Sequence, residues 1–416
     1  MRVTNATFYH DYAKSIQDLH ADLNKSIKQA ETERKYDSMD ENPLAYYGGK
    51  TLDNHYNDAD AKDTVISDVN NRLSQQETGA RDIQTTMRTI NTDLMKLRTG
   101  TTNGEVTTAE TLSNDMRQRL QSMANTLNSQ YENYYVFGGN DVTTVPFSLQ
   151  EDLNENDPSK SSYTLTFSHR FPGERNTTTN MEMKFSLDDD GNVNIEYSGN
   201  KVITDDYGNQ KSSTDLSSSD VQEAIRSAMS EQGRMSLGYG NLSNRDTLPD
   251  TFTGGLNMIT GLTSDAIKSI SDSDRSTAYT QIDEELKRSP IGLTIKSILS
   301  AGRYIKAVSD GENAAGAAES SGLNRDLGDV LDEWDDSEQR VSNTYRELGL
   351  RQEILSDTQD HLKTLKDTLQ EQYTDKVGID QVEAITQMYS KQYSYNAALR
   401  LGSNVMQSSL FDYVQS

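Results

Sequence analysis

Residues that commonly catalyse reactions or bind metals are few and scattered along this chain. It has no cysteine, which excludes disulfide bonds, thiolate metal sites and cysteine nucleophiles. The histidines are His10, His20, His55, His169 and His361. No two of them have the spacing of three or four residues that places two ligands on one helix face. Gly-x-Ser-x-Gly, Walker and dinucleotide motifs are also absent, so we expect no catalytic, cofactor-binding or metal-binding residues and no enzyme.

An acidic segment at 188–192 has a spacing close to that of a calcium loop. Asp188, Asp190 and Gly191 would occupy positions three, five and six of an EF-hand. Position one would then be Ser186, and position twelve would be Tyr197, where the EF-hand needs a bidentate glutamate. The flanking residues alternate in the manner of strands rather than helices. The sequence therefore predicts a hairpin turn at this segment.

Composition limits the kinds of partner that the chain can have. Its 416 residues include 40 Lys and Arg against 65 Asp and Glu, which gives a formal net charge of −25. This balance excludes a nucleic-acid binder that works through a basic surface. No stretch approaches the roughly 18 apolar residues of a membrane span, and residues 1–10 lack the apolar core of a secretory signal peptide. We therefore expect a soluble protein that does not insert into membranes and is exported, if at all, by another route.

Hydrophobic residues make up 33% of the chain, which favours long amphipathic helices with a narrow apolar seam. From residue 69 to 97 they recur at alternating steps of four and three, the heptad pattern of a coiled coil, with Gln76 in a polar slot. A polar break at 99–104 and a second run over 112–134 predict a helical hairpin. Further apolar residues recur every seventh position from 327 to 369. The residues assigned to an intrachain coiled-coil core are Val69, Leu73, Ile83, Met87, Ile90, Leu94, Trp334, Val341, Leu348, Leu355, Leu362 and Leu369.

Between the helical segments the apolar period changes to two. Apolar and polar residues alternate at 163–167, 181–187 and 193–197, which predicts half-buried strands. The acidic turn joins the last two strands, and residues 205–209 have the composition of a further turn. Residues 217–220 supply helix caps ahead of a short apolar run. The middle of the chain, about 140–285, is therefore predicted to be a small α+β insert.

Both ends of the chain carry an amphipathic stripe that has no partner nearby in the sequence. Such stripes must pair with each other or with neighbouring molecules. We expect the ends, 1–40 and 380–416, to be largely unstructured in the isolated chain. The abundant tyrosines fit either packed helix edges or an assembly interface. The predicted interface comprises Phe8, Tyr12, Ile16, Leu19, Leu23, Val382, Ile385, Tyr389, Leu399, Val405, Leu410 and Phe411.

Several stretches together resemble the family of bacterial flagellins and their hook-filament junction proteins. The most specific is the carboxyl end, where residues 378–385, 394–399 and 408–413 read Gly-Ile-Asp-Gln-Val-Glu-Ala-Ile, Ser-Tyr-Asn-Ala-Ala-Leu and Ser-Ser-Leu-Phe-Asp-Tyr. Residues 40–45 resemble the acidic element after the family's first helix. Residues 135–139, with Pro146 and Phe147, resemble the end of its amino-terminal helical pair, and residues 348–352 resemble its Leu-Gly-x-Arg element. Residues 31–37 depart from the family's usual Ser-Gly-Lys-Arg-Ile-like stretch.

This resemblance implies a structural role. Family members are exported unfolded through the flagellar type III apparatus, so the implied location is the extracellular flagellum. Their termini pair as the inner tube of the axial structure, and the insert faces solvent. The implied partners are hook-associated protein 1 on the hook side, flagellin on the filament side, copies of the same chain in a ring, and an export chaperone. Neither nucleic acid, nor a membrane, nor a cofactor is implied.

The predicted fold is mainly α, an elongated bundle of long antiparallel coiled-coil helices from both chain ends with a small α+β insert. Its predicted parts are a terminal assembly helix at 1–40 paired with 380–416, a helical hairpin at 41–139, the insert at 140–285 and carboxyl-terminal helices at 286–379. The motifs Asn-Pro-Leu-Ala at 42–45 and Val-Phe-Gly-Gly at 136–139 favour a hook-filament junction subunit. A flagellin, or a secreted coiled-coil adhesin with a binding insert, is the alternative.

Overall fold

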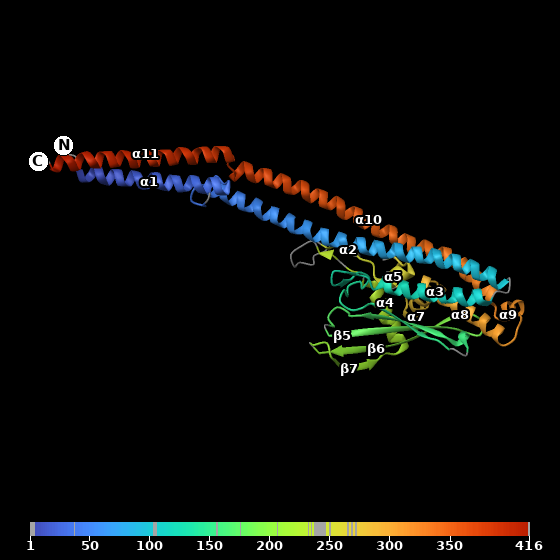
Figure 1. The fold of residues 1–416 in the computed structure, drawn as a ribbon. Helices are drawn as coiled ribbons and strands as arrows, with labels where there is room; N and C mark the ends of the chain where they lie inside the picture. Colours follow the sequence, from blue (N-terminus) through green and yellow to red (C-terminus); the bar gives the residue numbers. More distant parts are fainter. Residues whose placement is uncertain are drawn as a thin grey trace. The chain divides into compact units, whose positions relative to one another are not determined.

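The computed structural model of the chain is mostly helical and contains a small β-sheet in its middle, which confirms the predicted class (Figure 1). It describes residues 5–36, 38–102, 106–154, 157–174, 176–205, 207–231, 233, 235–236, 247–248, 251–263, 266–267, 269–270 and 273–414. For residues 5–6, 8, 100–102, 235–236, 247–248 and 404–414 it describes the backbone alone. The chain divides into two compact units: the terminal unit, Met1–Thr64 with Thr358–Ser416, and the central unit, Val65–Asp357.

The helices fall into long ones near the chain ends and shorter ones between them. The long helices are α1 (Asn5–Thr32), α2 (Pro43–Thr102), α10 (Leu323–Val377) and α11 (Gln381–Val414). The shorter ones are α3 (Val106–Leu127), α4 (Ser218–Ser230), α5 (Gly255–Thr260), α7 (Arg275–Lys287), α8 (Pro290–Ser309) and α9 (Ala314–Ser320). Polar side chains start several of them, since Ser217, Asp274 and Ser289 each accept a hydrogen bond from a first-turn N–H. The predicted domain limits at 40, 139, 285 and 379 stay predictions.

The apolar seams predicted on α2 and α10 are buried. Leu73, Ile83, Met87, Ile90, Leu94, Trp334, Val341, Leu348 and Leu355 are at most 2% exposed, and Leu362 and Leu369 are 8% exposed. Val69 is only half-buried, and Ile66, one helical turn earlier, is fully buried in its place. Within the central unit the two helices run in opposite directions, because Arg81 donates to the Tyr345 hydroxyl while Arg88 pairs with Glu338.

The sheet of the central unit is an antiparallel meander in the order β3-β4-β5-β6-β7. Its strands are β3 (Phe147–Asp152), β4 (Ser162–His169), β5 (Thr177–Leu187), β6 (Val193–Thr204) and β7 (Gln210–Asp215). The predicted strands at 163–167, 181–187 and 193–197 all lie in it. Alternate residues such as Leu165, Met183 and Ile195 are buried, and α3, α4 and α8 contact the sheet. Short ribbons β1 (Gln130–Tyr131) with β2 (Tyr134–Tyr135), and β8 (Met235–Ser236) with β9 (Thr247–Leu248), lie outside it.

The strand β7 forms one edge of this sheet. All six of its residues are polar and exposed, among them Lys211 and Asp215. The pairing of β6 with β7 shifts register between Ile203 and Thr204. The edge is therefore short, polar and irregular at one end.

The acidic segment that resembled a calcium loop is the β5–β6 hairpin turn, as predicted. The Asn192 N–H donates to the Asp188 carboxylate at 2.8 Å, and Gly191 has a φ of +89°, which glycine adopts without strain. Guanidinium groups hold this turn from outside, because Arg303 of α8 donates to the Asp188 carbonyl and Arg325 of α10 donates to the Asp190 carbonyl. These two arginines bind the sheet to the helices of the central unit.

The segment between β2 and β3 packs tightly against helices. Phe137 is fully buried, and a Cβ atom added to Gly79 of α2 would lie 2.7 Å from its ring. Asp141, which follows, is 7% exposed and accepts hydrogen bonds from Thr143 at 3.0 Å and from the Arg170 N–H at 2.9 Å. Burial alone would raise the pKa of Asp141, but these bonds and one from Thr144 outweigh it and hold the pKa below its ordinary value.

We expect Leu355→Ala to lower the free energy of unfolding by about 2–5 kcal/mol, because the side chain is 2% exposed and its removal leaves a cavity. Leu350→Ala is the matched control, since Leu350 lies in the same helix but is 58% exposed. Denaturant titrations of both variants measure the difference. Equal losses would show that the seam on α10 is not a packed core.

We expect Asp141→Asn to lower the free energy of unfolding by about 1–3 kcal/mol at pH 7, since hydrogen bonds to a buried carboxylate are lost or weakened. The folded pKa of Asp141 lies below the unfolded value of about 3.9. Its ionised form therefore stabilises the fold above that value, and this contribution disappears as the pH falls through the folded pKa. The gap between wild type and variant should shrink between pH 7 and pH 3 in urea titrations. A gap of constant size would contradict this origin.

Candidate assembly interface

The two terminal helices contact each other within one chain (Figure 1). Residues 5–32 and 381–414 are thus helical and paired in the single chain, whereas both ends were expected from the sequence to be largely unstructured in isolation. Pairing of their stripes with neighbouring molecules stays a prediction. The Tyr12 hydroxyl donates to the Ala398 carbonyl at 2.8 Å, and the His20 ring lies 5.5 Å from the ring of Tyr395. An ion pair between Lys391 and Asp22 lies further along the pair, with N and O 2.6 Å apart. Opposite stripes on α1 and α11 thus meet over much of their length.

The stripe that α1 turns toward α11 is the one that the sequence predicted. Tyr12, Ile16, Leu19 and Leu23 are all half-buried, and Ser26 is 5% exposed. Because these side chains already contact α11, they contribute first to the pairing within the chain. Their predicted role between chains stays a prediction.

The facing stripe on α11 combines small residues with Met388 and Tyr395, and none of its residues was assigned to the interface from the sequence. Ala384 and Gly402 are buried, and Met388, Tyr395 and Ala398 are half-buried, at steps of four, seven, three and four. A Cβ atom added to Gly402 would lie 1.8 Å from the Tyr12 oxygen, so the position of the Tyr12 side chain requires glycine there. Ala384, Ala398 and Gly402 were the available signal within this stripe, and a search for large apolar residues misses them.

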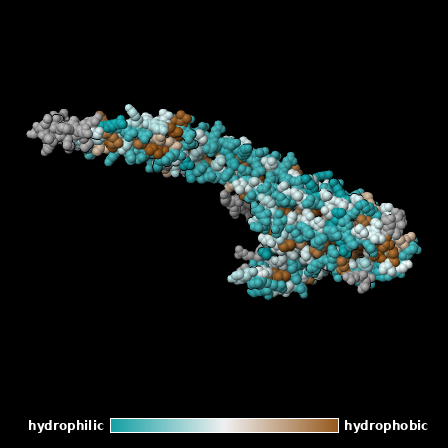
Figure 2. Space-filling model, viewed as in Figure 1, coloured by the Kyte–Doolittle hydropathy of each residue, from teal (hydrophilic) through white to brown (hydrophobic). Residues whose placement is uncertain are grey.

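The large apolar residues of α11 lie on its other side. Val382, Ile385, Tyr389 and Tyr393, here called the outer stripe, follow steps of three and four and are exposed. At 100° per residue they point away from the stripe of Ala384 and Gly402. Val382 is 73% exposed and Tyr393 is 78% exposed. Leu399 and Leu401, on either side of the outer stripe, are 42% and 64% exposed. Figure 2 shows hydrophobic side chains, in brown, on the surface of this helical pair.

The predicted interface residues therefore divide into three groups. The four on α1 with described side chains pack against α11. Val382, Ile385, Tyr389 and Leu399 remain exposed in the single chain. The side chains of Phe8, Val405, Leu410 and Phe411 lie outside the described residues. Tyr393 and Leu401 join the exposed group although they were not assigned to it from the sequence.

The described residues also bear on three other possibilities: a metal site, a membrane span and a catalytic histidine. In the described part of the chain, no group of three or more His, Asp or Glu residues is placed to hold a metal ion. Among the same residues, no helix combines the length and the apolar character that crossing a membrane requires. His169 is 1% exposed and packs between the rings of Phe167 and Phe171, as a core residue does. No model of a known protein family matches the chain, and no curated protein matches it.

We expect Gly402→Ala to weaken the α1–α11 pair by about 1–3 kcal/mol, because the added methyl group overlaps the Tyr12 hydroxyl. Gly349→Ala in α10 is the matched control, since a Cβ atom there meets no atom within 4 Å. The control should be neutral or stabilising by up to about 1 kcal/mol. Amide hydrogen exchange along α1 reports the effect, and unchanged protection in Gly402→Ala would contradict the pairing.

Proposed function

We propose that this protein is a structural subunit that assembles with copies of itself through the outer stripe of α11. The observation that carries the proposal is that α11 has two apolar faces, of which α1 covers only one. An exposed row of large apolar side chains marks an interaction surface in a soluble protein. Tyrosine suits such a surface because its ring buries a large area while its hydroxyl remains bonded.

The resemblance to flagellar proteins supports the same assignment from a separate direction. Its most specific residues, 378–385 and 394–399, lie at and within α11, the helix that bears the outer stripe. We infer that the chain is similar in role to hook-associated protein 3, which joins the hook to the filament. Its partners would be hook-associated protein 1, flagellin, further copies in a ring and an export chaperone, outside the cell. The long helices would form an elongated antiparallel coiled-coil bundle in that assembly.

A flagellin would present the same outer stripe, so the stripe does not separate the two flagellar roles. Deleting the gene in its source bacterium does. If the protein is a junction subunit, cells that lack its gene should keep their hooks and lose their filaments in electron micrographs. Expression of related filament genes should not restore the filaments. Restoration by those genes would favour a flagellin, and an unchanged flagellum would exclude both roles.

We expect the double change Val382→Ser and Tyr393→Ser to abolish self-assembly while leaving the melting temperature within about 2 °C of wild type, because both side chains are exposed in the single chain. Sedimentation velocity at rising concentration, followed by electron microscopy, measures assembly.

The matched control for this variant is the double change Val145→Ser and Tyr207→Ser. It removes the same residue types from the central unit, where they are 50% and 91% exposed. The control should assemble like wild type. Equal loss in both variants would show that replacing any exposed Val and Tyr with serine impairs assembly. Normal assembly of the α11 variant would show that the outer stripe is not part of the interface.

A further inference from the structure

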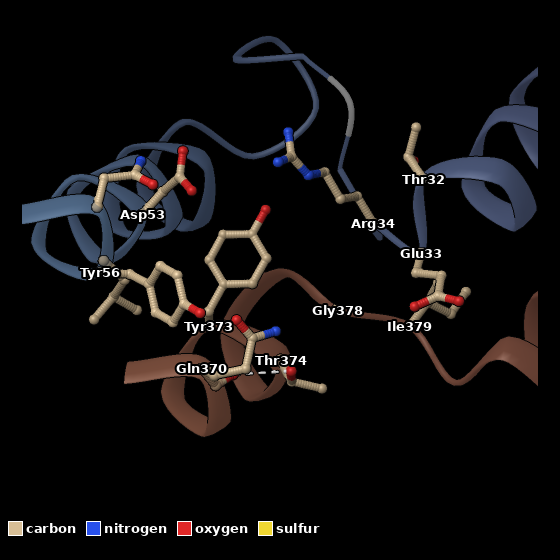
Figure 3. Close-up of a pocket in the computed structure, with 12 residues that line it drawn as sticks. Thr32, Glu33, Arg34, Asp53, Tyr56, Gln370, Tyr373, Thr374, Gly378 and Ile379 are labelled. Carbon is tan, nitrogen blue, oxygen red and sulfur yellow. Dashed lines mark hydrogen bonds between the residues drawn. The ribbon is translucent and has the colours of Figure 1, made fainter. Parts of the chain in front are cut away.

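A hollow of about 360 Å³ lies in the terminal unit where two helix connections meet (Figure 3). One connection follows α1 and the other joins α10 to α11. They are bonded to each other, since the Lys35 N–H donates to the Val377 carbonyl at 2.6 Å and the Ile379 N–H donates to the Glu33 carbonyl at 3.1 Å. Glu33 has a φ of +52°, a conformation that non-glycine residues seldom adopt. The wall of the hollow is thus a fixed backbone feature.

Polar side chains from several elements face this hollow without bonding to one another. Tyr56 and Asn57 come from α2, and Gln370 and Tyr373 come from α10. Within the described part of the chain these four side chains form no hydrogen bond. Two phenols and two amides therefore offer uncommitted donors and acceptors around a space of ligand size.

The charges at the hollow are nearly balanced. The Arg34 guanidinium lies over the ring of Tyr373, 5.7 Å from its centre. Asp53 is 3.5 Å from the Lys50 ammonium, and Glu33 supplies a second carboxylate. An anion would approach two carboxylates, and a cation would approach the guanidinium, so a charged ligand gains little on either account. The lining suits a neutral molecule.

From this lining we propose that the hollow binds one neutral sugar ring. A pyranose presents hydroxyl groups around its edge, which the two amides and the guanidinium can bond in the ring plane. Its C–H faces are apolar and match the ring of Tyr56, since the Arg34 guanidinium already lies over the ring of Tyr373. The volume of about 360 Å³ is large enough for one such ring. This binding does not depend on the function proposed above, since it uses other residues than the outer stripe.

The test measures the binding of three sugars of equal ring size to the full chain by saturation-transfer NMR. Glucose is neutral, glucosamine is a cation and glucuronate is an anion. Glucose is expected to bind with a dissociation constant of about 1–10 mM, and each charged probe at least about fivefold more weakly. No transfer to glucose at about 50 mM, or stronger binding of either charged probe, would overturn the proposal.

Substitutions in the hollow then test whether the sugar binds there. Gln370→Ala and Tyr56→Ala should each weaken glucose binding at least about fivefold, whereas Tyr207→Ala, at an exposed turn of the central unit, should leave it unchanged. Tyr56→Phe keeps the ring and serves if Tyr56→Ala fails to fold, with an expected loss of about two- to threefold. Binding that is insensitive to both pocket positions would put the sugar elsewhere and refute the assignment.

Discussion

One buried amide bonds α2 to two segments of the central unit that lie far away in the sequence. Gln76 lies fully buried in the apolar seam of α2, donates to the Val136 and Thr253 carbonyls and accepts from the Thr253 N–H. Arg351 of α10 donates to the Thr253 hydroxyl at 3.0 Å from the other side. Buried backbone groups without a partner are costly, so an apolar residue at 76 would complete the seam and leave two chain segments unbonded. Phe137, next to the bonded Val136, packs against Gly79 of the same helix.

Patterns with a short period were readable from the sequence because each residue's environment is set by its neighbours along the chain. The seam from Leu73 to Leu94 and the strands around Leu165 and Met183 follow from periods of 3.5 and 2 alone. The polar slot at Gln76 was visible as well, but its partners were not, since Val136 and Thr253 lie 60 and 177 residues away. Pairings at such separations depend on the folded backbone.

The terminal helices show a different limit. Large apolar residues at the two ends form equally clear stripes, and the sequence does not say which stripe is covered inside one chain. On α11 the covered stripe is the one with Ala384 and Gly402, where small side chains let the helices approach, while Tyr389 stays outside. Packing depends on closeness of fit as much as on hydrophobicity, so a ranking by side-chain size selects the wrong side for the intrachain contact.

The edge strand β7 matters most when many copies lie close together. A free sheet edge is a template for pairing with another edge, and a high local concentration favours that pairing. Lys211, the polar side chains of the whole strand and the register shift beside Thr204 all weaken such pairing. Copies held side by side by their helices would then have sheets that do not fuse into fibrils. In the assembly proposed above, β7 would therefore leave contact between neighbouring copies to the helical surfaces.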